Sequence, residues 1–289
     1  MKFLIIVTLI WAFSFSLIGE FLAGRIDSYF AVLIRVAIAA AIFVPFTNFR
    51  IDNSIKLKIM GIGIIQIGFM YILFYKSFLF LSVPEVILFT IFTPIYITLM
   101  HDIIHQRFTP LYLISASLAV VGAFIIRYNG INSGFVTGFL MVQGANICFA
   151  LGQVAYKYLM EQKSMRDVKQ LSVFGYFHFG ALIVSIIAFM LFGNMDKISP
   201  DTTQWMALVW LGVVASGLGY FLWNKGAVEV DSGILAIMNN ALVPAGLLVN
   251  LFLWNKDINI TALIIGGTVI ASSLYVHRII MDRVTKPIQ

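Results

Sequence analysis

The chain has one cysteine in 289 residues, Cys148, and that cysteine lies inside an apolar run. A single thiol excludes an intrachain disulfide and a metal cluster held by cysteines, so we interpret Cys148 as a small buried hydrophobic residue. Charged residues are also scarce, because they make up 11% of the chain against 61% hydrophobic residues. A soluble protein of this length could not bury so much apolar surface. The composition therefore predicts a membrane protein that has the lipid bilayer as its partner.

Motifs for catalysis and nucleotide binding are absent from the sequence as well. Without a Walker loop, ATP coupling within the chain is excluded, and we expect no ATPase subunit to be required. No set of metal ligands and no nucleophile with its base stands out, so we expect no metal, no cofactor and no enzymatic activity. The four-residue spacing of His101 and His105 suits a metal, but a pair alone beside Arg107 is a weak signal. A membrane enzyme or a partner subunit is therefore the weaker interpretation.

The apolar runs predict an all-α polytopic membrane protein with ten transmembrane helices joined by short connections. The first run is long enough to span, so we interpret it as a helix and not as a signal peptide. The ten expected spans are Phe3–Leu22, Tyr29–Phe46, Leu57–Leu81, Pro84–Asp102, Leu111–Ile126, Phe135–Tyr158, Leu171–Gly193, Gln204–Lys225, Ser232–Trp254 and Ile258–Ile280.

The net charge of +6 does not indicate nucleic acid, because the basic residues sit in the short loops between spans. With the N-terminus inside, thirteen of the 19 lysines and arginines fall on the inner side and five on the outer side. The remaining one, Arg35, lies within a span. An excess of basic residues marks the cytoplasmic side. The sequence therefore predicts that both termini are cytoplasmic.

Two copies of one unit follow each other in the chain. Each copy has five spans, an odd number, so the second enters the membrane upside down relative to the first. Such inverted repeats are typical of secondary transporters, with the substrate site near the bilayer midplane. We expect a first repeat over residues 1–128 and a second over 134–281. The residues that recur in order are Gly63, Gly68, Tyr71, Leu73, Lys76 and Pro94, which match Gly212, Gly217, Tyr220, Leu222, Lys225 and Pro244.

This pattern, with Trp11 in span one and Arg35 in span two, resembles the drug/metabolite transporter superfamily (the EamA-type permeases) over essentially the whole chain. The resemblance implies a secondary transporter that moves a small metabolite by alternating access. Longer strings are similar to the enterobacterial members that transport biotin, which implies biotin uptake across the bacterial cell inner membrane. Export of amino acids, amines or related metabolites stays open, as do the coupling ion and the oligomeric state. The strings are WAFSFSLIGEFLAG, DSYFAVLIRV, TPIYITL, GVVASGLGYFLWN and MNNALVPAGLLVNL.

Polar residues inside the spans are the first candidates for the substrate pathway, because each needs an internal partner or a water-lined cavity. Span six carries Asn146 and Gln153 on one helical face, which either lines the pathway or bonds neighbouring helices. Asn239 and Asn240 are adjacent and point about 100° apart, so both cannot face one cavity. Among the aromatic residues, Trp11 and Tyr156 are the better pathway candidates.

Charged and titratable residues are the second group of candidates. Arg35 either pairs with Glu20 at similar depth or, like Lys76, attracts an anionic carboxylate. Glu85 opens span four close to Lys76 and is interpreted as its solvated vestibule partner. His178 lies inside span seven and is either a structural histidine or the carrier of a coupling proton.

Overall fold

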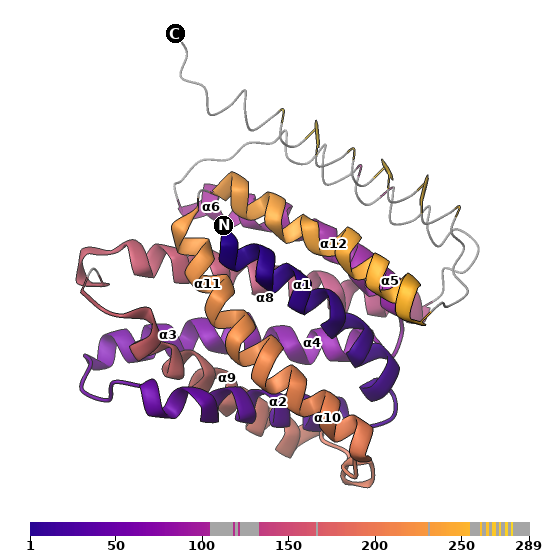
Figure 1. The fold of residues 1–289 in the computed structure, drawn as a ribbon, viewed down its shortest axis with the longest axis horizontal. Coiled ribbons are helices and arrows are strands. Elements are labelled where there is room, and N and C mark those ends of the chain that lie inside the picture. The colour runs from indigo at the N-terminus through magenta and orange to yellow at the C-terminus, as the bar shows by residue number, and fades with distance from the viewer. Residues whose placement is uncertain are drawn as a thin grey trace.

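The computed structural model describes residues 1–104, 133–165, 167–230 and 232–254, together with single residues at 118, 121, 261, 264, 265, 268, 269, 272, 275, 276 and 279. Within these residues the regular secondary structure is helical, and the helices form one bundle (Figure 1). The α-helices are α1 Lys2–Leu17, α2 Ser28–Phe43, α3 Asn53–Gly63, α4 Met70–Ser77, α5 Val83–Phe89, α6 Thr93–Ile104, α8 Ser133–Glu161, α9 Gln170–Phe192, α10 Thr202–Trp210, α11 Gly219–Glu229 and α12 Ser232–Trp254.

Short segments of other helical type join several of these helices into longer ones. Three are π-helical, at Ile18–Leu22, Ile64–Phe69 and Leu211–Leu218. A 3₁₀ turn at Thr90–Phe92 links α5 to α6, and further 3₁₀ turns occupy Val44–Phe46, Lys163–Met165 and Met195–Lys197. Wider π turns are rare and concentrate at functional sites, so their positions in spans one, three and eight are relevant to the site.

Seven joined stretches are long and apolar enough to cross a membrane, and Met238–Trp254 is a shorter apolar helix. The chain is therefore a multi-pass membrane protein. These eight helices correspond to eight of the ten predicted spans. The other two predictions, Leu111–Ile126 and Ile258–Ile280, lie outside the described residues, as do His105 and Arg107. The seven stretches are Lys2–Leu22, Ser28–Phe46, Asn53–Ser77, Val83–Ile104, Gly134–Glu161, Gln170–Phe192 and Thr202–Glu229.

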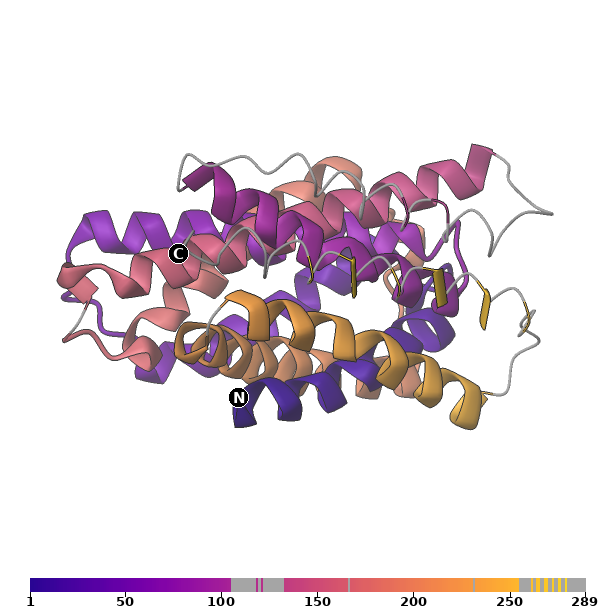
Figure 2. The same ribbon diagram turned by 90° about the horizontal axis from the view of Figure 1, so that it is seen from above.

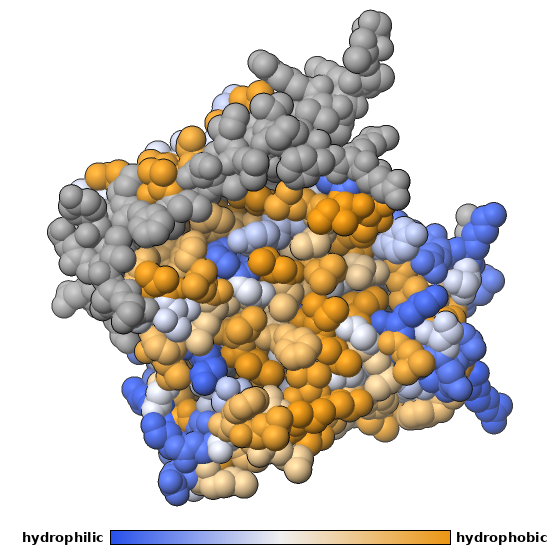
Figure 3. Space-filling view, turned by 180° about the vertical axis from the view of Figure 1, so that it is seen from behind, coloured by the Kyte–Doolittle hydropathy of each residue, from blue (hydrophilic) through white to orange (hydrophobic). Residues whose placement is uncertain are grey.

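Polar side chains cap the starts of several helices. Asp27 accepts a hydrogen bond from the Phe30 backbone N–H, and Asp201 forms a capping box with Gln204. Such caps satisfy backbone donors that a helix leaves unpaired. From behind, hydrophobic residues form a broad band, with hydrophilic residues gathered at the two ends of the bundle (Figure 3).

Contacts at the ends of the bundle show the direction in which each helix runs. At one end, the Lys225 ammonium lies 4.8 Å from the Phe3 ring centroid and the Lys157 ammonium donates to the Val230 carbonyl. At the other end, the Asp27 N–H donates to the carbonyl of Lys197. Helices α3 and α4 therefore run from the first end to the second, and α10 and α11 run back in the opposite direction (Figure 1).

Glycines allow close approach where α3 crosses α9. A Cβ atom at Gly63 would overlap the backbone carbonyl of Phe177, and one at Gly180 would overlap the carbonyl of Met60. Small residues permit this backbone-to-backbone packing in membranes, where lipid is as apolar as the side chains. Helices α1 and α12 pack side by side (Figures 1 and 2). Both contribute residues to the cavity described next.

Candidate functional site

A cavity of about 80 Å³ lies inside the bundle, and helices from both halves of the chain line it. Four of the residues predicted to line a pathway are on its wall: Trp11, Arg35, Asn146 and Asn239. A mostly apolar concave site with a few polar groups is the usual form of a small-molecule site. The other lining residues are Ser14, Phe15, Ile18, Met70, Tyr71, Phe74, Thr90, Thr93, Ala145, Phe149, Tyr220, Trp223 and Leu242.

Aromatic rings form one side of the wall around Trp11. Its ring centroid lies 5.0 Å from that of Tyr220, 4.9 Å from Trp223 and 5.8 Å from Phe149. Its indole N–H donates to the carbonyl of Ala215, 2.9 Å away in the π-helical segment of span eight. A π turn leaves some carbonyls without their usual helical partner. Three aromatic rings and one hydrogen bond therefore hold the indole in a fixed orientation.

Arg35 is the cation of the cavity, and its side chain is only 2% exposed. Its Nε donates to Ser216 Oγ, and its Nη1 donates to the Tyr75 hydroxyl at 3.2 Å. The guanidinium carbon lies 4.1 Å from the centre of the Tyr71 ring, a cation–π distance. Hydroxyls and a ring thus orient Arg35, and among the described residues no carboxylate pairs with it.

Two amides line the same cavity. The Asn146 side-chain nitrogen donates to the Phe89 carbonyl at 2.8 Å, and the Asn239 nitrogen donates to the Leu235 carbonyl at 2.8 Å. Gln143 lies next to Asn146, 3.3 Å away, and its amide oxygen also accepts the Tyr96 hydroxyl. On span six, Asn146 therefore both lines the cavity and bonds a neighbouring helix, while Gln143 contacts it from outside the wall.

Between the cavity and the end of the bundle that holds Lys225, further polar contacts join neighbouring helices, and one of them, Gln66 to Asn224, joins the two halves of the chain. The Trp223 indole N–H donates to Gln153 Oε1 at 2.6 Å, so Gln153 supports the aromatic wall without lining the cavity. Gln66 donates to Asn224 at 3.2 Å in the same region. Cross-helix hydrogen bonds thus connect the helices between the cavity and this end of the bundle.

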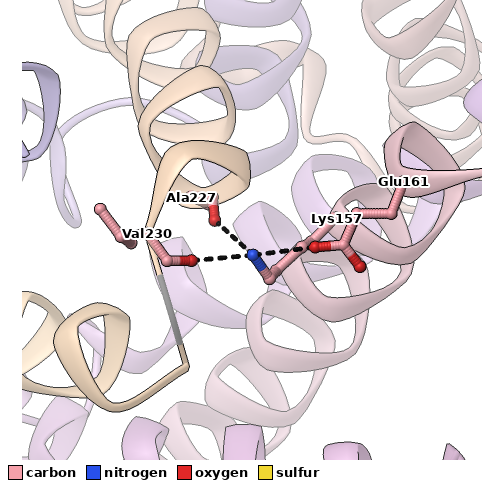
Figure 4. Close-up of polar contacts among 4 residues, drawn as sticks. All are labelled: Lys157, Glu161, Ala227 and Val230. Carbon is pink, nitrogen blue, oxygen red and sulfur yellow. Dashed lines mark hydrogen bonds and ion pairs between the residues drawn. The ribbon is translucent and has the colours of Figure 1, made fainter. Parts of the chain in front are cut away.

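Lys157 ends this series of contacts. Its ammonium donates to the carbonyls of Ala227 at 3.2 Å and Val230 at 2.8 Å, and it lies 3.1 Å from Glu161 (Figure 4). The two carbonyls are at the C-terminal end of α11, where a helix has unpaired acceptors and a partial negative charge. Lys157 therefore fastens α8 to the end of α11.

Tyr156, a predicted pathway residue, and His178, a predicted structural or proton-carrying residue, both lie away from the cavity. Tyr156 is buried against Phe174 and Phe177, and its hydroxyl donates to Gln170 at 3.4 Å, so it is a packing residue outside the cavity. His178 is fully buried and stacks on Phe43 at 5.2 Å, and neither of its ring nitrogens has a hydrogen-bond partner among the described residues. It does not line the cavity.

The charge pairs expected from the sequence have other partners in the structure. Arg35 is oriented by hydroxyls rather than by Glu20, which lies on the π-helical segment of span one. Glu85 is buried and accepts hydrogen bonds from the Ser82 N–H and hydroxyl, so it caps α5 and is not a solvated vestibule group. Lys76 lies over the ring of Tyr29 and donates to its hydroxyl.

Of the adjacent amides, Asn239 lines the cavity and Asn240 does not. The Asn240 side-chain oxygen is buried and has no hydrogen-bond partner among the described residues. The sequence singled out Trp11 and Tyr156 among the aromatic residues and favoured interface or packing roles for most of the others, yet Tyr71, Tyr220 and Trp223 are all on the cavity wall. The recurrence of Tyr71 as Tyr220 at matching places of the two copies is the signal that could have identified this pair.

The fold and the cavity define a helical membrane protein with a mostly apolar cavity lined by both halves of the chain. The EamA-like transporter family matches residues 1–128 and 136–278, so the chain belongs to this family. It is therefore a membrane transporter and not an enzyme.

Named relatives agree with this assignment. The chain is 52% identical over 281 residues to the "Biotin transporter" of Escherichia coli (strain K12), which covers 96% of this chain and 93% of that protein. It is 51% identical to the "Biotin transporter" of Salmonella typhimurium, with the same coverage, and 48% identical to the "Probable biotin transporter" of Pseudomonas aeruginosa, over 96% of this chain and 98% of that one. A crystal structure with 17% identity superposes with a TM-score of 0.68 over 95% of each chain, which is a similarity of fold alone.

Proposed function

We propose that this transporter takes up biotin across the bacterial cell inner membrane and that the cavity around Trp11 and Arg35 is its substrate site. The observation that carries the proposal is the identity of 48% to 52% with three proteins named as known or probable biotin transporters, over 96% of the chain. The chemistry of the wall supports it, because aromatic rings, two amides and one arginine suit a ring system, a ureido group and a carboxylate.

The proposed transporter has ten spans arranged as two inverted repeats, over residues 1–128 and 134–281. The opposite directions of α3–α4 and α10–α11 support this arrangement, and so do the π-helical segments at matching places, Ile64–Phe69 and Leu211–Leu218. In inverted-repeat transporters the two copies exchange conformations around a site at the midplane. Alternating access around the cavity follows from this arrangement.

Uptake of labelled biotin tests the proposal directly. In a biotin-requiring host that lacks its own transporter, the chain is expected to restore saturable uptake, and excess unlabelled biotin should abolish it. Cells with the empty vector provide the control. Transport of amino acids or amines without any biotin uptake would contradict the proposal and favour the exporter alternative.

Both termini are proposed to be cytoplasmic, because the described basic residues gather at the end of the bundle that holds Lys225. Green fluorescent protein fused after Asn48 is expected to fluoresce, and alkaline phosphatase fused after Met195 is expected to be active. The two sites are in loops at opposite ends of the bundle, between α2 and α3 and between α9 and α10. A fluorescent protein that stays dark after Asn48, together with a phosphatase that stays inactive after Met195, would refute this orientation.

A further inference from the structure

Hydrogen-bonding capacity is distributed unevenly over the cavity wall, and this asymmetry limits what the cavity accepts. Five wall residues with side-chain donors already donate within the protein. The three hydroxyl groups donate to backbone carbonyls one turn earlier, one indole donates to Ala215 and the other donates to Gln153. The five are Ser14, Thr90, Thr93, Trp11 and Trp223. These five donors are therefore already used within the protein.

The two cavity amides present acceptors. The side-chain nitrogens of Asn146 and Asn239 donate to backbone carbonyls, and a carbonyl can accept only from the NH₂ side of an amide. This fixes the rotation of both amides. Neither amide oxygen accepts a hydrogen bond from any described residue. Two carbonyl oxygens are thus available at this part of the wall, and they require N–H or O–H groups from a ligand.

Arg35 presents the opposite chemistry. A guanidinium has five N–H donors, and the described contacts use two of them, one to Ser216 and one to Tyr75. The side chain is a buried cation in an apolar bundle without a carboxylate partner in the described part of the chain. Such a charge attracts an anion strongly, and its planar fork matches a carboxylate. Within the described residues, the hydroxyl partners leave the positive charge without an anion, which a ligand would supply.

We propose that the cavity recognises its substrate at two chemically opposite poles. Arg35, held by Tyr75 and Ser216, binds the carboxylate, and the side-chain oxygens of Asn146 and Asn239 accept the two N–H groups of a cyclic urea. The aromatic rings around Trp11 enclose the apolar body between the poles. This inference rests on the proposed function, because biotin carries a ureido ring at one end and a carboxylate at the other. It goes further in assigning each end to named residues.

Competition by biotin analogues against purified protein tests both poles. In the wild-type protein, neutral biotinamide is expected to bind about 100-fold more weakly than biotin, because it cannot supply the anion that Arg35 lacks. In Arg35→Gln the preference for biotin should shrink to about threefold or less, since the discriminating charge is gone. Lys76→Gln removes a cation of the neighbouring span three that is not on the wall, and it should keep the wild-type preference.

The amide pole is tested with biotin methylated on the ureido nitrogen that faces Asn239, which is the one of the two N-methyl isomers that Asn146→Leu still discriminates against. This analogue is expected to bind the wild-type protein at least about tenfold more weakly, because it lacks one N–H donor. Asn239→Leu should bring the two ligands to nearly equal affinity. Asn240→Leu is the matched control, since it removes an adjacent amide that does not line the cavity, and it should preserve the difference.

The outcomes separate this inference from the proposed function. Binding of biotin with equal binding of biotinamide by the wild-type protein would overturn the arginine pole, even where Arg35→Gln does not fold. A preference for the free acid that survives in folded Arg35→Gln would overturn it as well, and an Asn239→Leu protein that still discriminates against the methylated ligand would overturn the amide pole. Failure of the wild-type protein to bind biotin at all would instead overturn the proposed function.

Discussion

Gly63→Ala is expected to remove most of the folded protein from the membrane. The added Cβ would overlap the backbone carbonyl of Phe177, and a carbonyl cannot rotate away as a flexible side chain can. Helices α3 and α9 would have to separate, and the reciprocal contact between Gly180 and the Met60 carbonyl would open with them. Overpacking of this kind costs about 3 kcal/mol or more, and the thermal midpoint should fall by about 5 °C or more.

Gly61→Ala is the matched control for this experiment. It lies two residues away on α3, and a Cβ there meets no atom within 4 Å. Alanine favours a helix over glycine by about 1 kcal/mol, so this variant should be at least as stable as the wild type. The measurement is the amount of monodisperse protein and its melting temperature in detergent. Equal melting of the Gly63→Ala and Gly61→Ala proteins would show that α3 and α9 tolerate the separation.

Eight spans and four residues of the cavity wall could be predicted from the sequence for a common reason. A run of apolar residues with bilayer length forms a helix in almost any packing arrangement, since lipid requires internal backbone hydrogen bonds. Arg35, Asn146 and Asn239 interrupt such runs with groups that lipid does not solvate, so they had to face the interior. Here the constraint acts residue by residue and needs no knowledge of the neighbouring helices.

The rest of the wall depends on how each helix is rotated, which a single sequence does not reveal. Tyr71 and Trp223 follow the π-helical segments Ile64–Phe69 and Leu211–Leu218. A π turn takes in extra residues, so the 3.6-residue period cannot be carried across it. This shift turns both rings toward the cavity, although the sequence favoured interface or packing roles for most aromatic residues. The choice between Asn239 and Asn240 has a similar origin, because the rotation of α12 decides which one faces inward.

Local hydrogen bonds also compete with the charge pairs that sequence proximity favours. Glu85 was expected to pair with Lys76, but it accepts from the Ser82 N–H three residues before it. An acidic residue in the first turn of a helix gains both the hydrogen bond of a capping box and a favourable helix dipole. Lys76 has an aromatic partner in Tyr29 instead. The sequence shows which charges are near one another but not which of them form ion pairs and which form local hydrogen bonds instead.

Trp11→Ala is expected to lower the affinity for biotin by about 100-fold or more, because truncation of a buried tryptophan is among the substitutions that weaken binding most. The indole contacts Tyr220, Trp223 and Phe149, and it donates to the Ala215 carbonyl. Its removal would let these rings move into the space that the substrate occupies. Trp11→Phe keeps a ring but removes the N–H, so a smaller loss of about tenfold is expected.

The control is Trp205→Ala, because Trp205 is 41% exposed, packs against Phe30 and does not line the cavity. Its affinity for biotin should match the wild type. Melting temperatures separate a binding defect from unfolding: Trp11→Phe should melt close to the wild type while binding more weakly, since the carbonyl of Ala215 loses its donor but the ring packing persists. Wild-type affinity in a folded Trp11→Ala protein would show that biotin is held elsewhere, and the cavity would then no longer serve as the proposed substrate site.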